Sequence, residues 1–174
     1  FLVVRSIPIP RGKVGGRGYA LNPMLSMREQ ATDFDDWRQL GLEGWGWDDV
    51  LPFFQAHEDH YAGRADLTYG TAGELHVDAP RVHWPVLDVV AKAAQEAGIP
   101  WTEDFNGGDN TGVGTFLLNQ KKGLRFQAAK AFLKPALGRA NLKLETGVLA
   151  ERVVFDEGRA VGVTYRKAGT TATA

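Results

Sequence analysis

A glycine-rich, basic segment between Arg11 and Met24 constrains this chain most, because it is unsuited to a regular helix or strand. It begins Arg-Gly-Lys and contains four glycines, and Asn22 near its end comes directly before an apolar stretch. Glycines let the backbone take positive φ and approach a ligand closely, and successive N–H groups of such a loop can form a concave anion site. The segment is neither a GxGxxG fingerprint nor a Walker loop. Taken alone, it predicts either a phosphate or cofactor cradle or a surface loop that needs turns.

The composition is that of an ordinary globular domain. With 174 residues, 44% of them hydrophobic and 24% charged, the chain is long enough to bury one core. Twenty basic and 21 acidic side chains give a net charge of −1, so no nucleic-acid partner is expected. No apolar run approaches the roughly 18 residues of a membrane-spanning helix, and there is no cysteine for a disulfide or thiolate site. The sequence therefore predicts a cytoplasmic protein with no membrane partner.

Neither end has the character of a natural terminus. The chain starts at Phe1 within an apparent strand and stops at Thr170–Ala174, just after another.

Apolar periodicity and turn residues predict helices and strands in mixed order. Helices are expected at 32–40, Trp47–Glu58, Val86–Ala97 and Arg125–Leu133, with a short helical segment near Met24–Gln30. Strands are expected at 1–9, Glu74–Val77, Val113–Gln120, Leu142–Thr146, Leu149–Asp156 and Ala160–Tyr165, with turns at Lys121–Gly123 and Glu157–Gly158 and loops at 59–72 and 100–112. The predicted fold class is α/β, or α+β as a fragment, ending in an antiparallel β-meander.

Few residue clusters suggest chemistry of their own. His57 and His60 lie beside two carboxylates and could bind zinc, but no HExxH motif is present, and a polar helix end explains the cluster equally well. The adjacent pairs Asp35–Asp36 and Asp48–Asp49 lie at helix starts, where capping explains them. His76 is interpreted as a packed, hydrogen-bonded residue, and the five tryptophans as packing residues. The sequence predicts no metal site and no catalytic residue.

Beyond the loop, short blocks follow one another in a fixed order. They are DFDDW, GWGWDDVLPFF, GTAGELHV, DFNG, GVG, RFQAAKAFLKP and NLKLETG. In order and spacing, these blocks resemble the middle of the glucose–methanol–choline (GMC) flavin oxidoreductases, whose pattern reads RGKxLGGSSxxN, DYDDW, GWxxDDVLPYF, HGxxGPLHV, DFNG, GVG, RxSAAxAYLxP, NLxVxTGAxVxRI and GVxY. The resemblance extends from about Arg5 to Arg166.

The resemblance implies part of a Rossmann-like FAD domain together with part of a substrate domain. It assigns residues 1–40 and 113–174 mainly to the FAD domain and 41–112 mainly to the substrate domain, within one partial domain. Asn22 and Met24 are then expected beside the isoalloxazine, and Gly15 and Gly16 near the ribityl-diphosphate. The backbone of Ala150 is expected at the adenine.

The resemblance also implies the reaction, in which a small-molecule alcohol is oxidised to an aldehyde by hydride transfer to flavin N5. The dinucleotide fingerprint and catalytic histidine of the family match nothing in this sequence, and the two serines of its loop are replaced. We therefore expect the 174 residues to be inactive alone, with the remainder of the same protein as partner. One alternative is a non-catalytic module or degenerate relative held by a partner. The other is a small metal-dependent enzyme using His57 and His60.

Overall fold

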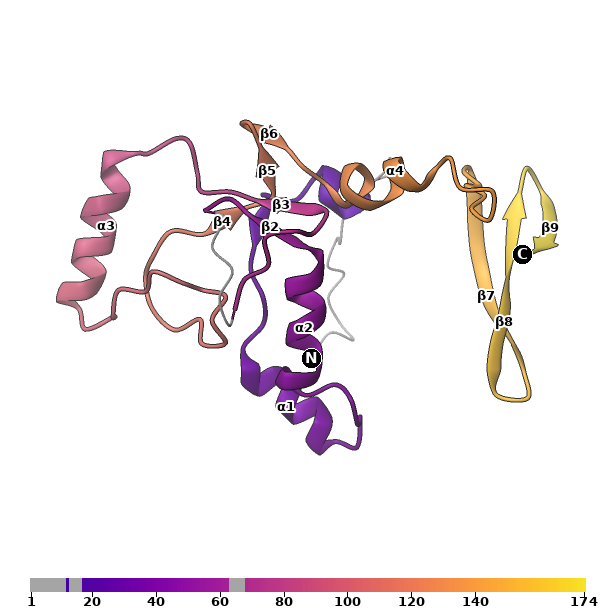
Figure 1. The fold of residues 1–174 in the computed structure, drawn as a ribbon, viewed down its shortest axis with the longest axis horizontal. Helices are drawn as coiled ribbons and strands as arrows, with labels where there is room; N and C mark the ends of the chain where they lie inside the picture. The colour runs from indigo at the N-terminus through magenta and orange to yellow at the C-terminus, as the bar shows by residue number, and fades with distance from the viewer. Residues whose placement is uncertain (1–11, 13–16, 63–67) are drawn as a thin grey trace, which may run out of the picture. The chain divides into compact units, whose positions relative to one another are not determined.

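The computed structural model describes residue 12 and residues 17–62 and 68–174. It divides into two compact units, Phe1–Pro135 and Ala136–Ala174, which are described separately. Figure 1 shows the elements of both units. The expected strand at residues 1–9 lies outside the described residues.

The first unit mixes helices with short strands. Its elements are η1 (Arg17–Ala20), β1 (Leu25–Ser26), α1 (Ala31–Gln39), α2 (Trp47–His57), β2 (Glu58–His60), β3 (Leu75–Val77), α3 (Pro85–Glu96), β4 (Leu117–Leu118), β5 (Gln120–Lys121), β6 (Leu124–Arg125) and the π-helical η2 (Ala129–Leu133), which runs into α4 (Lys134–Ala136). The strands form three two-stranded sheets, antiparallel β1–β4, parallel β2–β3 and antiparallel β5–β6. Two of these short pairs, β1–β4 and β2–β3, connect segments that are separated in sequence, whereas β5–β6 is a local hairpin.

Aromatic side chains hold α1 against α2. The buried ring of Phe34 lies 5.5 Å from the Trp37 ring, 5.7 Å from the Trp47 ring and 5.9 Å from the Phe54 ring, between centroids. Asp35 of α1 accepts a hydrogen bond of 3.1 Å from the backbone N–H of Trp47, the first residue of α2. The packing interpretation is confirmed for these tryptophans. Capping is confirmed for Asp49, which accepts a hydrogen bond of 3.0 Å from the Gly46 N–H at the start of α2, but Asp35 and Asp36 lie inside α1 rather than at its start.

The chain after α2 returns close to the helix end. An added Cβ at Gly70 would lie 1.8 Å from the carbonyl oxygen of Gln55, and one at Gly73 would lie 2.0 Å from the carbonyl carbon of His57. Only glycine fits such close backbone contacts. The two glycines therefore allow this segment to pack against the end of α2, where β2 begins.

The second unit is an antiparallel meander of β7 (Val148–Asp156), β8 (Arg159–Lys167) and β9 (Thr170–Thr173). Its two turns are Glu157–Gly158, with φ of 45° and 80°, and Ala168–Gly169, with φ of 49° and 86°. Two consecutive positive φ values in a two-residue hairpin loop define type I′ turns, which match the twist of the strands. The Lys122–Gly123 turn between β5 and β6 has the same form, with φ of 55° and 78°.

Sequence patterns predicted the fold class and the main helices correctly. The mixed fold with a C-terminal meander is confirmed, as are helices close to the expected α1, α2 and α3 and turns at 121–123 and 157–158. The division between FAD-domain and substrate-domain elements stays a prediction.

Within the described residues, no helix combines the length and apolarity required to cross a membrane.

Several expected elements are wrong. The segment near Met24–Gln30 is extended because Leu25 and Ser26 pair with β4, and residues 58–60 are a strand because they pair with β3. The expected strand at 113–120 is reduced to short pairings, and the helix expected from Arg125 begins at Ala129, because Arg125 pairs with Gln120. Leu142–Thr146 is irregular, and β9 supplies the third meander strand instead. The pairings of residues 25–26 and 58–60 depend on distant segments that local patterns do not reveal, whereas those of Arg125 and β9 are local hairpins.

Substitution of Gly158 tests the assignment of the type I′ turn between β7 and β8. Gly158→Ala places a Cβ on a residue with φ of 80° and is expected to destabilise the β7–β8 hairpin by about 1 kcal/mol. Native-state hydrogen exchange of the β7 and β8 amides measures this loss. The matched control is Gly138→Ala, in the same unit, where an added Cβ meets nothing within 4 Å and φ is not positive. Equal effects of the two substitutions would contradict the turn assignment.

Candidate functional site

The segment from Gly18 to Met24 forms a turn built around the side chain of Asn22. The backbone N–H groups of Leu21 and Asn22 donate to the carbonyl oxygen of Gly18 at 3.0 and 2.8 Å. Asn22 Oδ1 then accepts from the backbone N–H of Met24 at 3.1 Å, which is an Asx-turn. Pro23 lies in the middle of this turn, where its fixed φ is favourable and its missing N–H is not needed.

Met24 has φ of 67°, the left-handed conformation that a residue with a side chain rarely adopts. Two contacts with distant segments support the strained turn. The backbone N–H of Asn119 donates to the Met24 carbonyl at 2.7 Å. The Arg125 guanidinium donates from Nη1 to the Tyr19 carbonyl at 2.8 Å and to Asn22 Oδ1 at 2.9 Å. Left-handed residues held by their surroundings in this way are concentrated at functional sites.

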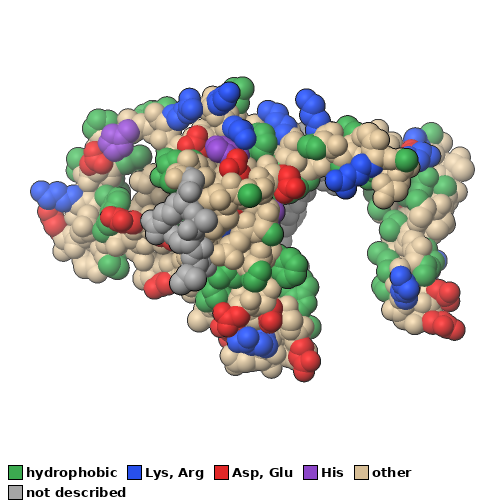
Figure 2. Space-filling view, in the orientation of Figure 1, with side chains coloured by type: hydrophobic (Ala, Val, Ile, Leu, Met, Phe, Trp, Pro, Cys, Tyr) green, Lys and Arg blue, Asp and Glu red, His purple; other side chains and the backbone are tan. Residues whose placement is uncertain are grey.

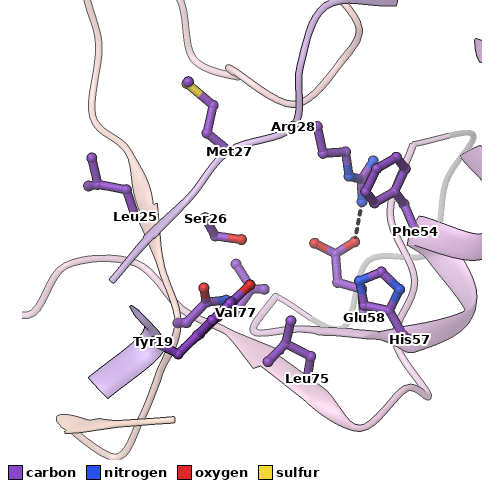
Figure 3. A pocket seen from close by; sticks show the side chains of 11 residues that line it. Tyr19, Leu25, Ser26, Met27, Arg28, Phe54, His57, Glu58, Leu75 and Val77 are labelled. Atoms are coloured by element: carbon purple, nitrogen blue, oxygen red, sulfur yellow. Dashed lines mark hydrogen bonds and ion pairs between the residues drawn. The ribbon is translucent and has the colours of Figure 1, made fainter. Parts of the chain in front are cut away.

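A cavity of about 110 Å³ borders this turn (Figure 3). Tyr19, the segment from Leu25 to Arg28, Glu58 and Asn119 are among the residues that line it. Asn119 is 3% exposed, and its Nδ2 donor has no hydrogen-bond partner within the described part of the chain. A cavity of this size has room for only a few waters, at about 30 Å³ each.

A buried ion pair forms one side of the cavity. Arg28 Nη2 lies 2.6 Å from Glu58 Oε2, and the two side chains are 8% and 6% exposed (Figure 3). Arg28 also donates to the Thr68 carbonyl at 2.7 Å, and its Cζ lies 5.4 Å from the centroid of the Phe54 ring. Burial raises the pKa of Glu58, while the charge of Arg28 and the Gly70 N–H act to lower it. The pair thus ties the segment after β1 to the end of α2.

The DFNG block extends this network. Asn106 accepts a hydrogen bond of 2.7 Å from the Arg28 backbone N–H and donates one of 3.2 Å to the Ser26 carbonyl. Asp104 accepts a bond of 2.7 Å from the Asn106 N–H and another from the Tyr69 hydroxyl. Burial and the bond to Asp104 raise the pKa of Tyr69, so its hydroxyl remains a donor. This block positions the backbone after β1.

The other cofactor residues expected from the sequence lie elsewhere. Gly15 and Gly16 are outside the described residues. Ala150 belongs to the second unit, where it pairs with Tyr165 of β8 next to a register shift between Ala150 and Arg152. Such bulges re-aim the strand locally and are frequent near functional sites. The structure brings Asn22 and Met24 together in one turn, and the roles of all five residues stay predictions.

The histidines have individual contacts. His57 Nδ1 lies 2.7 Å from the Phe53 carbonyl, and the His60 ring lies 4.2 Å from that of Tyr69, between centroids. His76 Nδ1 lies 2.7 Å from Asp59 Oδ2, which confirms its interpretation as packed and hydrogen-bonded. Burial acts to raise the pKa of Asp59, but the hydrogen bonds and charges of His76 and Lys121 together outweigh it, so the pKa is lowered. The described residues contain no group of three or more His, Cys, Asp or Glu arranged to hold a metal ion.

The sequence analysis missed three residues that shape the site, Arg28, Asn119 and Arg125. Arg28 lies outside every block that suggested a family, and nothing local pairs it with Glu58, 30 residues away. Arg125 opens the RFQAAKAFLKP block but was expected to begin a helix. The available signal was the turn at Lys121–Gly123, which implied a hairpin with Arg125 on its second strand.

Residues 3–174 match the family described as GMC oxidoreductase. Because the match covers nearly the whole chain, this protein belongs to the GMC oxidoreductase family, and the expected resemblance is confirmed.

Two curated relatives are choline dehydrogenases. The oxygen-dependent choline dehydrogenase of Sinorhizobium fredii is 41% identical over 165 residues, covering 95% of this chain and 30% of the relative. The mitochondrial choline dehydrogenase of Mus musculus is 39% identical over 160 residues, covering 92% of this chain and 27% of the relative. The chain thus spans less than a third of the length of these relatives.

Among solved structures, an FAD-dependent oxidoreductase from Chaetomium thermophilum aligns with a TM-score of 0.86 at 25% identity, over 98% of this chain and 32% of that one. Pyridoxine 4-oxidase from Mesorbium loti aligns with a TM-score of 0.82 at 32% identity, over 94% of this chain and 32% of that one. These structures support the fold of the segment.

The buried ion pair gives a test of the site's framework. Arg28→Met leaves the Glu58 carboxylate buried without its cation and is expected to destabilise the first unit by about 3–5 kcal/mol. Replacing both residues, Arg28→Met with Glu58→Leu, is expected to restore much of that loss, since no buried charge remains. Urea unfolding followed by tryptophan fluorescence measures both, because all five tryptophans lie between residues 37 and 101.

The control is Arg38→Met. Its partner Asp35 lies 2.8 Å away, but the two side chains are 47% and 35% exposed, so a loss below about 1 kcal/mol is expected. A loss at Arg28 no larger than that at Arg38 would show that the buried pair does not hold the framework.

Proposed function

We propose that this chain forms part of the flavin site of an FAD-dependent oxidoreductase that acts on CH–OH donors. The observation that carries the proposal is the Asn22–Met24 turn, which combines a left-handed Met24 with support from Asn119 and Arg125. Membership of the GMC oxidoreductase family and an FAD-dependent structural relative support the same cofactor.

The residues of the turn fit a flavin in their chemistry. Asn22 offers a side-chain amide and Met24 a thioether and an apolar stem, and the strained backbone is fixed in place. The neighbouring cavity of about 110 Å³ does not fit, because it holds only a few waters and cannot enclose a three-ring system. A cofactor at this turn therefore requires further walls from outside the cavity.

We assign the remaining roles by family resemblance. Gly15 and Gly16 would lie near the ribityl-diphosphate, and the Ala150 backbone would meet the adenine. When bound, FAD supplies the hydride acceptor. The chain's own contribution is to bind and orient it, and the residue that takes the alcohol proton belongs to another part of the protein.

The partner we propose is the remainder of the same polypeptide. Large apolar side chains of α3 are exposed, among them Val86 at 58%, Val89 at 67% and Val90 at 56%. The meander likewise exposes Leu149 at 57% and Phe155 at 65%, and Figure 2 shows hydrophobic side chains interspersed with charged ones on the visible face. Val86, Val89 and Val90 share one face of α3, and exposed apolar faces of this kind normally contact other polypeptide. A protein as long as the relative of which this chain spans 30% would have the additional residues to cover it.

Separate halves of the cofactor test the site. Riboflavin, which carries the isoalloxazine without phosphate, is expected to shift the amide resonances of Asn22 and Met24 in an NMR titration of the ¹⁵N-labelled chain. AMP, which carries the adenine, is expected to shift the Ala150 resonance instead. The AMP titration is the control for the riboflavin titration at Asn22 and Met24, and the riboflavin titration is the control for the AMP titration at Ala150. Riboflavin shifts that avoid the Asn22–Met24 turn would overturn the proposed site.

Turnover tests the assignment of the chain as a partial enzyme. The 174 residues mixed with FAD and a primary alcohol are expected to reduce no artificial electron acceptor dye above the rate with FAD alone, because the chain provides no assigned proton acceptor. Dye reduction that depends on both alcohol and chain would contradict the expected inactivity.

A further inference from the structure

The hydrogen bonds at Asn22 fix the orientation of its side-chain amide. Oδ1 faces two groups that only donate, the Arg125 guanidinium at 2.9 Å and the Met24 backbone N–H at 3.1 Å. An amide rotated by 180° would turn its NH₂ group toward both donors and lose both bonds. The Nδ2 group is therefore directed away from Arg125, and within the described part of the chain it has no hydrogen-bond partner.

Arg125 is itself held in place by the fold. The Lys122–Gly123 turn sets the β5–β6 register, in which Arg125 pairs with Gln120. The Arg125 carbonyl accepts a hydrogen bond of 3.0 Å from Lys130 Nζ. At the open end of the hairpin, the Asn119 N–H donates to the Met24 carbonyl. The hairpin thus supports the turn at the Met24 carbonyl and at the Asn22 side chain.

We propose that Arg125 is a positioning residue that makes Asn22 a hydrogen-bond donor to the flavin. The ligand group at this position is then an acceptor, a ring carbonyl oxygen or an unprotonated ring nitrogen of the isoalloxazine. The inference rests on the proposed function, whose site it deepens by assigning the direction of one hydrogen bond. Without Arg125, only the Met24 N–H bond still favours this orientation, so the rotated amide, which presents its oxygen to a bound acceptor, becomes more populated.

Asn22→Asp separates the donor role from a structural one. The aspartate keeps an oxygen for Arg125 and for the Met24 N–H, and its charge strengthens the bond to Arg125. The Met24 amide is therefore expected to exchange no faster than in the unsubstituted protein. Riboflavin affinity is expected to fall about tenfold, because a carboxylate oxygen replaces the donor. Riboflavin has no phosphate, so charge repulsion with a phosphate does not enter.

Arg125→Ala tests the positioning role without any ligand. Hydrogen exchange of the Met24 and Asn119 amides is expected to rise about tenfold when the two guanidinium bonds are lost. Arg125→Lys keeps the charge but lacks the planar guanidinium that aims Nη1 at both acceptors, so intermediate exchange rates and partial recovery of riboflavin affinity are expected. The control is Arg81→Ala, which removes the same charge beside Gly123 at the other end of this hairpin.

The outcomes are distinct. Faster Met24 exchange in Arg125→Ala but not in Arg81→Ala, with weaker riboflavin binding by Asn22→Asp, supports the inference. Unchanged Met24 exchange in Arg125→Ala overturns the positioning role. Undiminished riboflavin affinity in Asn22→Asp overturns the donor role. If the unsubstituted protein binds no riboflavin at this turn while Arg125→Ala still loosens it, the proposed function and the donor role fail and only the hairpin's support of the turn stands.

Discussion

The framework of the first unit depends on the buried contact between Arg28 and Glu58. Removing two charges from water costs desolvation free energy, and hydrogen bonds and the attraction between the charges must offset it. Arg28 meets this demand with the Glu58 carboxylate at 2.6 Å, the Thr68 carbonyl at 2.7 Å and an aromatic face, while Glu58 also accepts from Gly70 at 3.2 Å. Three segments of the chain, around Arg28, at the end of α2 and at residues 68–70, therefore have to take one arrangement for either charge to be satisfied.

Two of the family blocks contribute to that arrangement. DFNG supplies Asp104 and Asn106, which bind the backbone at Ser26 and Arg28. The glycines of GTAGELHV let residues 70–73 pass against the end of α2. These two blocks therefore support the segment that follows the Asn22–Met24 turn and the end of α2, whereas the loop that contains the turn is where this sequence departs from the family pattern.

Sequence reasoning was reliable where the determinants were local. The periodicity of Val86–Ala97 predicted α3, and Lys121–Gly123 and Glu157–Gly158 predicted hairpin turns, because glycine in the left-handed region signals them directly. Ala168–Gly169 forms the same turn and contains the same glycine signal, but it was missed because residues 170–174 were not expected to form a strand. The strand at residues 58–60 and the extended segment at 25–26 depend on partners 17 and about 93 residues away, which no local window contains.

The conformation of the Asn22–Met24 turn depends on both neighbouring and distant residues. Asn-Pro predicts a turn locally, but a left-handed Met24 costs about 1–2 kcal/mol and needs support from elsewhere. Two hydrogen bonds are enough to offset that cost, at about 1 kcal/mol each: the Met24 N–H donates to Asn22 Oδ1, and the Asn119 N–H donates to the Met24 carbonyl. Because Asn119 and Arg125 belong to a hairpin about 100 residues later, the conformation exists only in the folded unit. In the proposed function, the turn is thereby formed before a ligand arrives, and binding does not have to order it.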